Sequence, residues 1–230
     1  MTKDKILVVE DDRDLSFIAC TQLEEMGYLT EAAYSGEDAK ESLNSEQFDI
    51  ILLDMMLQDT TGIELCREIR KKVYCPIIFV SCIGEQETVI EALKEGGDDY
   101  IVKPVNFGEL QARIEANLRR KREYDRKTAG KEQLVCGSFA LNMHTHNLIL
   151  EDSTEISLSP IEYKLVTMFL EHENELLLYE ELYRCIWESD DLGDVRTVMV
   201  HVSNLRKKME QIRRECIQTV RGAGYIFNSR

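Results

Sequence analysis

The sequence predicts two domains, an α/β domain with a five-stranded parallel sheet and a smaller domain that mixes short strands with three helices. Up to residue 122, short apolar segments alternate with segments whose apolar residues recur at helical spacing. This alternation is typical of a parallel sheet with helices on both faces. From residue 134 the pattern changes to short alternating segments and amphipathic helices. We therefore expect a first domain over 1–122, a linker over 123–131 and a second domain over 132–230.

The third strand is the clearest element of the first domain. Residues 50–53 are consecutive apolar residues, which is typical of a strand buried on both faces. They run directly into Asp54, whose carboxylate belongs at the rim of such a sheet rather than in its core. The other strands are expected at 6–9, 29–33, 76–80 and 100–102, and the helices at 15–26, 37–43, 62–70, 87–94 and 107–122.

The second domain follows a charged segment that lacks apolar spacing and is typical of a linker. Its first helix is marked by Ser159-Pro160 with Glu162 close behind, because Ser caps a first turn and Pro is tolerated at its first position. A strand, a turn with glycines and a second strand end the chain. Strands are expected at 134–136, 139–141, 148–150 and 155–158, helices at 159–170, 179–187 and 195–214, and the hairpin at 219–227.

Charge is distributed unevenly along the chain. The formal net charge of -15 argues, by itself, against a nucleic-acid partner. Residues 196–230, however, hold eight Lys and Arg against two Asp and Glu, so the chain has a basic end. No apolar run approaches the ~20 residues of a membrane span, and the N-terminus lacks a signal-peptide pattern. Seven cysteines without CxxC pairs favour free thiols in a reducing compartment, so we expect a cytoplasmic protein without a membrane partner.

Polar side chains follow four of the expected strands, at the edge where parallel strands end. Clustered carboxylates suit a hard cation such as Mg²⁺, and a carboxylate can attack phosphorus to form an aspartyl phosphate. Taken alone, Asp54 is more typical of an ordinary residue that caps the next loop. It is the joint placement that favours a phosphoryl-transfer site. The residues are Glu10, Asp11 and Asp12 after the first strand, Asp54 after the third, Ser81 after the fourth and Lys103 after the fifth.

Three segments resemble the receiver domain of response regulators: VVEDD at 8–12, LLDMML at 52–57 and GGDDYIVKP at 96–104. The resemblance covers 5–122 and implies a flavodoxin-like, doubly wound sheet. It also implies a cis peptide bond before Pro104. The implied roles are Asp54 as phosphoacceptor, Glu10, Asp11, Asp54 and the Met56 backbone carbonyl as ligands of Mg²⁺ or Mn²⁺, Ser81 and Lys103 as phosphoryl contacts, and Ser81 and Tyr100 as a switch.

Haloacid-dehalogenase-like phosphatases also use an Asp nucleophile on such a sheet, but they need a second Asp where this chain has Met56. Two departures from the receiver pattern remain. Gln58 replaces a usual Pro, which we expect to loosen the loop after Asp54, and Val89 replaces a basic residue that usually meets Glu109 across a dimer interface. We still expect the dimer, because one exposed ion pair contributes only ~0.2–1 kcal/mol. On the implied dimer face, Asp98 would pair with Arg120 and Asp99 would pair with Arg113. Glu109 belongs to the same face.

The second half resembles the winged-helix effector domain of the OmpR/PhoB family, on RTVMVHVSNLRKKME at 196–210 and TVRGAGYIF at 219–227. The resemblance covers about 132–230 and implies that the last helix enters the major groove of double-stranded DNA. From charge alone, a basic helix face that is simply solvated stays an open alternative. The DNA-binding residues implied by position are Arg196, Thr197, His201, Ser203, Asn204, Arg206, Lys207, Arg221 and Tyr225.

Three departures in this half bear on DNA binding. Ile226 stands where an Arg usually follows the wing Tyr, Met199 stands where Asp is common, and Ser203-Asn204 stands where a basic pair is common. Fewer positive groups predict a smaller salt dependence and weaker non-specific binding.

Together the two resemblances imply a phosphorylation-controlled, DNA-binding transcription regulator. We expect no enzymatic activity beyond the Mg²⁺-dependent phosphorylation of its own Asp54. The expected partners are a sensor histidine kinase, double-stranded DNA, a second copy of the chain after phosphorylation, and RNA polymerase. Two alternatives stay open: a phosphate-independent regulator that uses the receiver only for dimerisation, and a protein-interaction switch that binds DNA weakly.

Overall fold

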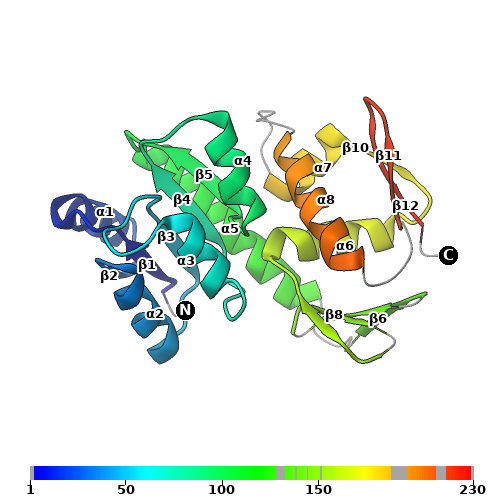
Figure 1. The fold of residues 1–230 in the computed structure, drawn as a ribbon, viewed down its shortest axis with the longest axis horizontal. Helices are drawn as coiled ribbons and strands as arrows, with labels where there is room; N and C mark the ends of the chain where they lie inside the picture. Colours follow the sequence, from blue (N-terminus) through cyan, green and yellow to red (C-terminus); the bar gives the residue numbers. More distant parts are fainter. Residues whose placement is uncertain are drawn as a thin grey trace. The chain divides into compact units, whose positions relative to one another are not determined.

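A computed structural model of the chain describes residues 3–127, 133–137, 139–143, 145–150, 152–187, 196–210 and 216–228, without the side chains of 120–127. The chain divides into two compact units, Met1–Arg119 and Arg120–Arg230 (Figure 1). Over the described ranges, the two units share no sheet and no hydrophobic core, so each is described by itself.

The first unit is built on a five-stranded sheet with the order β2-β1-β3-β4-β5. All neighbouring strands are parallel, and β1 pairs with both β2 and β3. This order is the flavodoxin-like one, so the predicted fold class is confirmed. The strands are β1 (Lys5–Val9), β2 (Leu29–Ala33), β3 (Ile50–Leu53), β4 (Ile77–Ser81) and β5 (Asp99–Val102).

Helices cover both faces of this sheet, which is why β3 reads as an unbroken apolar run. Ile51 and Leu53 point into one core, against α2, α3 and α4. Ile50 and Leu52 point into the other, where Leu23 of α1 and Ile114 of α5 pack. The helices are α1 (Arg13–Glu25), α2 (Gly36–Ser45), α3 (Gly62–Ile69), α4 (Gln86–Lys94) and α5 (Phe107–Lys127).

The last helix of this unit is longer than predicted. α5 continues to Lys127, five residues beyond the predicted end at 122. The added residues are mainly Glu, Arg and Lys, which are good helix formers, and they include no Pro or Gly. The absence of regularly spaced apolar residues after Leu118 therefore indicates where α5 stops packing on the core, not where the helix ends.

In its described residues, the second unit has two antiparallel sheets and three helices. Strands β6 (Gln133–Cys136), β7 (Phe139–Asn142), β8 (Asn147–Leu150) and β9 (Glu155–Ser157) form one sheet in sequence order. Helices α6 (Pro160–Glu171), α7 (Tyr179–Trp187) and α8 (Arg196–Met209) follow. A second sheet has the order β10-β12-β11 and contains β11 (Ile217–Val220) and β12 (Gly224–Phe227), the predicted hairpin.

The sequence did not indicate β10 (Leu176–Leu178), because three leucines before a helix carry no strand period. The strand exists through tertiary pairing, with Leu176 opposite Ile226 on β12. The predicted start of α6 is confirmed by a capping box between Ser159 and Glu162. Helix α8 ends at Met209, and the last part of its predicted range, 211–214, lies outside the described residues.

Candidate functional site

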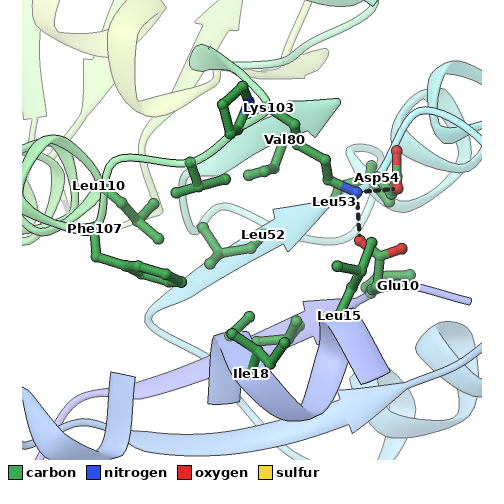
Figure 2. Close-up of a pocket in the computed structure, with 15 residues that line it drawn as sticks. Glu10, Leu15, Ile18, Leu52, Leu53, Asp54, Val80, Lys103, Phe107 and Leu110 are labelled. Carbon is green, nitrogen blue, oxygen red and sulfur yellow. Dashed lines mark hydrogen bonds and ion pairs between the residues drawn. The ribbon is translucent and has the colours of Figure 1, made fainter. Parts of the chain in front are cut away.

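The site of the first unit lies at the carboxyl ends of adjacent strands. Asp54 follows β3 and Glu10 follows β1, and the backbone N–H of Asp54 donates to the Val9 carbonyl at 2.9 Å. Lys103 follows β5 and reaches back to both carboxylates, as Figure 2 shows. The parallel topology therefore brings together side chains that are 93 residues apart.

Lys103 forms a short ion pair with each carboxylate. Its Nζ lies 2.6 Å from Asp54 Oδ2 and 2.6 Å from Glu10 Oε2. Both carboxylates are only 8 % exposed. Burial raises the pKa of Glu10, opposed by the hydrogen bond from Lys103. Burial would lower the pKa of Lys103, but its hydrogen bonds to Asp54 and Glu10 outweigh burial, so that pKa is raised and the ammonium is charged at neutral pH.

An apolar pocket of about 230 Å³ lies beside these charges. Leu15 and Ile18 of α1 and Phe107 and Leu110 of α5 line it, over a floor that includes Leu52 (Figure 2). The apolar walls lower the polarity on one side of the carboxylates, which strengthens the interactions of their charges. No pattern in the sequence indicated this pocket, since it depends on the spacing of two helices over the sheet.

Ser81 and Tyr100 meet at the loop after β4. The Ser81 hydroxyl accepts a hydrogen bond from the backbone N–H of Ile83 at 3.2 Å, and the Tyr100 hydroxyl donates to the Ile83 carbonyl at 2.5 Å. Both side chains are buried, and the Tyr100 ring stacks on Phe79 with 6.0 Å between centroids. Burial raises the pKa of Tyr100. One loop residue, which the sequence did not single out, thus connects the two predicted switch residues.

The loop after Asp54 is closed by its own backbone. The Met56 N–H donates to Asp54 Oδ1 at 3.3 Å, and the Gly62 N–H donates to the Met55 carbonyl at 2.8 Å. A Cβ on Gly62 would lie 2.2 Å from the Asp54 carbonyl oxygen, so only glycine permits this closure. The Met56 side chain is 60 % exposed.

Asp59 anchors the same loop to α2. Its carboxylate accepts hydrogen bonds from the N–H groups of Gly36 at 2.9 Å and Glu37 at 3.1 Å. The Gly36 bond in particular lowers the pKa of Asp59. The loop that Gln58 was expected to loosen therefore has a fixed attachment, which no pattern in the sequence indicated.

The acidic residues can hold a hard cation, although they do not enclose one. Among the described residues, no three His, Cys, Asp or Glu side chains converge on one metal position. Mg²⁺ typically takes one or two protein carboxylates and keeps several waters, so Glu10 and Asp54 supply a fitting donor set. Asp11 is half-buried beside them. Asp12 instead caps α1, where it accepts from the N–H groups of Asp14 and Leu15.

The implied dimer face is only partly exposed. Arg113 pairs within the chain with Asp99 at 2.8 Å and with Glu109 at 2.8 Å. Asp98 is fully buried: its Oδ2 lies 2.5 Å from Arg70 Nη2 and accepts from the Ile77 N–H at 2.9 Å. The prediction that Asp98 pairs across a dimer is therefore corrected, because Arg70 already neutralises it inside the fold. The Arg120 side chain lies outside the described residues.

The structure divides the residues predicted to bind DNA into two groups. Arg196, Ser203 and Lys207 are exposed on α8, Thr197 is half-buried, and Arg221 is exposed at the turn between β11 and β12. His201, Asn204 and Tyr225 are buried, with exposed fractions of 1, 8 and 4 %. The buried group packs the helix and the hairpin rather than presenting side chains to a ligand.

Arg206, like the buried residues, makes its contacts within its own unit. Its Nη2 donates to the Ile217 carbonyl and to Thr219 Oγ1, both at 2.8 Å, and its guanidinium lies 5.3 Å from the centre of the Tyr225 ring. Arg206 therefore fixes the hairpin against α8, so its loss would disturb the second unit before it removed a DNA contact.

Comparison with known proteins defines the class. The response regulator receiver domain model matches residues 6–115, and the model of the C-terminal domain of transcriptional regulatory proteins matches residues 153–227. Together they define a two-component response regulator with a receiver domain and a DNA-binding domain. In the part of the chain that the structure describes, no helix is long and apolar enough to cross a membrane.

Full-length relatives give the family. The chain is 34 % identical to the regulatory protein VanRc of Enterococcus gallinarum, over 97 % of this chain and 98 % of that protein. It is 36 % identical to the phosphate regulon transcriptional regulatory protein PhoB of Rhizobium meliloti, over 98 % and 99 %. A crystal structure of DrrB, an OmpR/PhoB homologue from Thermotoga maritima, matches with a TM-score of 0.51 and 26 % identity, over 99 % of this chain and 100 % of that one. The chain belongs to the OmpR/PhoB family of response regulators.

Proposed function

We propose that Asp54 accepts a phosphoryl group from a phosphohistidine of a sensor histidine kinase, and that this controls dimerisation and promoter binding. The observation that carries the proposal is the pair of 2.6 Å contacts from Lys103 to Asp54 and Glu10. A buried carboxylate with a cation held against it is prepared for an incoming phosphoryl group. The cation already lies where the negative charge of phosphate would be added.

In the transfer, an Asp54 carboxylate oxygen attacks phosphorus, the P–N bond to the kinase imidazole breaks, and the imidazole leaves. Lys103 then donates to phosphoryl oxygens in place of carboxylate oxygens, and the Ser81 hydroxyl donates to another. Mg²⁺, when held by Glu10, Asp11, Asp54 and the Met56 carbonyl, would neutralise negative charge on the reacting groups. The apolar lining of the pocket lowers the polarity on one side of the site.

Phosphorylation then acts on the loop after β4. Ser81 gives up its contact with the Ile83 N–H to reach the phosphoryl group. Tyr100 is already buried with its hydroxyl on the Ile83 carbonyl. The active arrangement is therefore one that the unmodified chain can adopt, and the phosphoryl group shifts its population.

The output is a dimer on duplex DNA. We place Asp99, Glu109 and Arg113 on the dimer face, and Arg196, Ser203 and Lys207 on the DNA side of α8. The family membership supports a sensor kinase and DNA as partners in the cytoplasm, and RNA polymerase is a further proposed partner.

Phosphate labelling tests the phosphoacceptor. Incubation with a small labelled phosphodonor and Mg²⁺ should label the protein, and hydroxylamine should remove the label, as it does from acyl phosphates. Asp54→Asn should abolish labelling. Asp59→Asn is the matched control, because it removes a carboxylate of the same loop that faces α2, and it should still be labelled. Equal labelling of Asp54→Asn and wild type would refute the assignment.

A further inference from the structure

One apolar side chain stands on the exposed face of α8. The exposed residues from the start of this helix to the residue after its end are Arg196, Met199, Ser203, Lys207 and Glu210. Their spacing of three or four places all five on a single face of a helix. Met199 is 38 % exposed and is, among the described residues, the one large apolar side chain exposed on α8. Met199 is therefore the apolar group that this face offers to a partner.

The charge around Met199 indicates the partner. Arg196 precedes it on the same face and Lys207 follows it, and residues 196–230 carry a net charge of +6 in a chain of -15. A helix about 10–12 Å wide fits the major groove of duplex DNA, which is ~12 Å wide. Arg196 at the start of the face and Lys207 near its end suit contacts with phosphates, whereas Glu210 lies beyond Lys207. This step rests on the DNA-binding function proposed above.

The position of Met199 indicates what it contacts there. It is the fourth residue of α8, and recognition helices turn their N-terminal residues toward base edges. In the major groove the apolar group on a base edge is the C5-methyl of thymine. A flexible thioether side chain packs readily on a methyl group. We infer that Met199 is a specificity-determining residue that recognises a thymine methyl in each half-site.

The other side chains of α8 leave this role to Met199. His201 and Asn204, which were predicted to face DNA, are buried among residues of their own unit. Ser203 is exposed, but a hydroxyl can donate or accept and so discriminates weakly between bases. Met199 is therefore the exposed apolar side chain that can distinguish a thymine methyl on this part of the helix, while Arg196 and Lys207 add affinity through their charge.

The test replaces single thymine methyl groups. Full-length protein, with a small phosphodonor and Mg²⁺, selects its preferred duplex from random sequences. Each thymine of that duplex is then replaced by deoxyuridine, which differs only in lacking the methyl. At one position in each half-site the wild type should bind about fourfold more weakly, the value of one buried methyl-sized group.

Three variants complete the test. Met199→Ala should bind thymine and deoxyuridine duplexes equally at that position, whereas Met199→Leu should keep the difference. Val135→Ala, which shortens a 74 % exposed apolar side chain on β6, should keep it as well and serves as the matched control. The loss of affinity caused by deoxyuridine in the wild type, minus the loss in Met199→Ala, measures the contact between Met199 and the thymine methyl.

Two results would overturn the inference, and they can be told apart. If the wild type binds its selected duplex but no replacement weakens binding, or if the loss persists in Met199→Ala, Met199 does not recognise thymine. If the full-length chain binds no duplex preferentially, the proposed DNA-binding function fails and the role of Met199 fails with it.

Discussion

The site around Asp54 and the exposed face of α8 differ in what fixes their side chains. Asp54, Glu10 and Lys103 come directly after strands of one parallel sheet, so the topology brings them together. On α8 every residue lies near the same helix axis, and a rotation of 100° per residue decides which side chains are exposed. The position of a residue along the chain is therefore enough to locate a site at the ends of strands. Which residues of a helix are exposed depends also on how the rest of the unit packs against it.

The buried Arg70–Asp98 pair should show the largest effect on stability. Arg70→Ala leaves the Asp98 carboxylate buried without its cation, and we expect a loss of about 3–5 kcal/mol in the free energy of unfolding. Arg67→Ala, on α3 just before Arg70, removes the exposed ion-pair partner of Glu95 and should cost less than about 1 kcal/mol. Urea denaturation of both variants measures the difference, and equal losses would show that Asp98 is not sealed in the fold.

Lys103 tests whether the strand-end geometry carries the chemistry. Lys103→Met removes the cation from two buried carboxylates, and we expect the initial rate of labelling by a phosphodonor to fall about 100-fold, the typical loss for one charge-stabilising group. Lys40→Met, at an exposed cation paired with Glu37, is the control and should label at the wild-type rate. A Lys103→Met protein that labels normally would make the 2.6 Å contacts irrelevant to transfer.

His201 and Lys207 test the division of α8 into packing and contact residues. His201 is buried beside Trp187, so His201→Ala should lower the free energy of unfolding by about 1–3 kcal/mol. Lys207→Ala should leave stability within about 0.5 kcal/mol and reduce the slope of log affinity against log salt by about 1. Stability curves and salt titrations of both variants check this, and a reversed pattern would show that α8 turns another face to DNA.

The smallest effect is expected at Asp59. Hydrogen bonds from Gly36 and Glu37 lower its pKa in the folded protein, so its contribution to stability is present above the pKa of the unfolded chain and is lost as the pH falls through the folded value. Asp59→Asn should cost at most about 1 kcal/mol at pH 7. Between pH 7 and acid, the free energy of unfolding should fall less in the variant than in the wild type. An equal fall in both proteins would contradict a stabilising role for the Asp59 carboxylate.

Much of the fold and of the first site could be predicted from the sequence. The alternating pattern gives the parallel sheet, and its strand ends give Asp54, Glu10 and Lys103. The anchor of Asp59, the Ile83 link and the burial of Asp98 could not be predicted, because each depends on contacts between distant segments. His201 and Asn204 were assigned to DNA by family position, and only the packing of α8 in its unit shows that they point inward.

The central claim is that phosphorylation of Asp54 controls binding to duplex DNA. The most direct measurement is the affinity of the full-length protein for its selected duplex, with and without a small phosphodonor, in wild type and in Asp54→Asn. The structure predicts that the phosphodonor tightens binding of the wild type and leaves Asp54→Asn unchanged. Binding that ignores the phosphodonor in the wild type, or that tightens equally in both proteins, would contradict it.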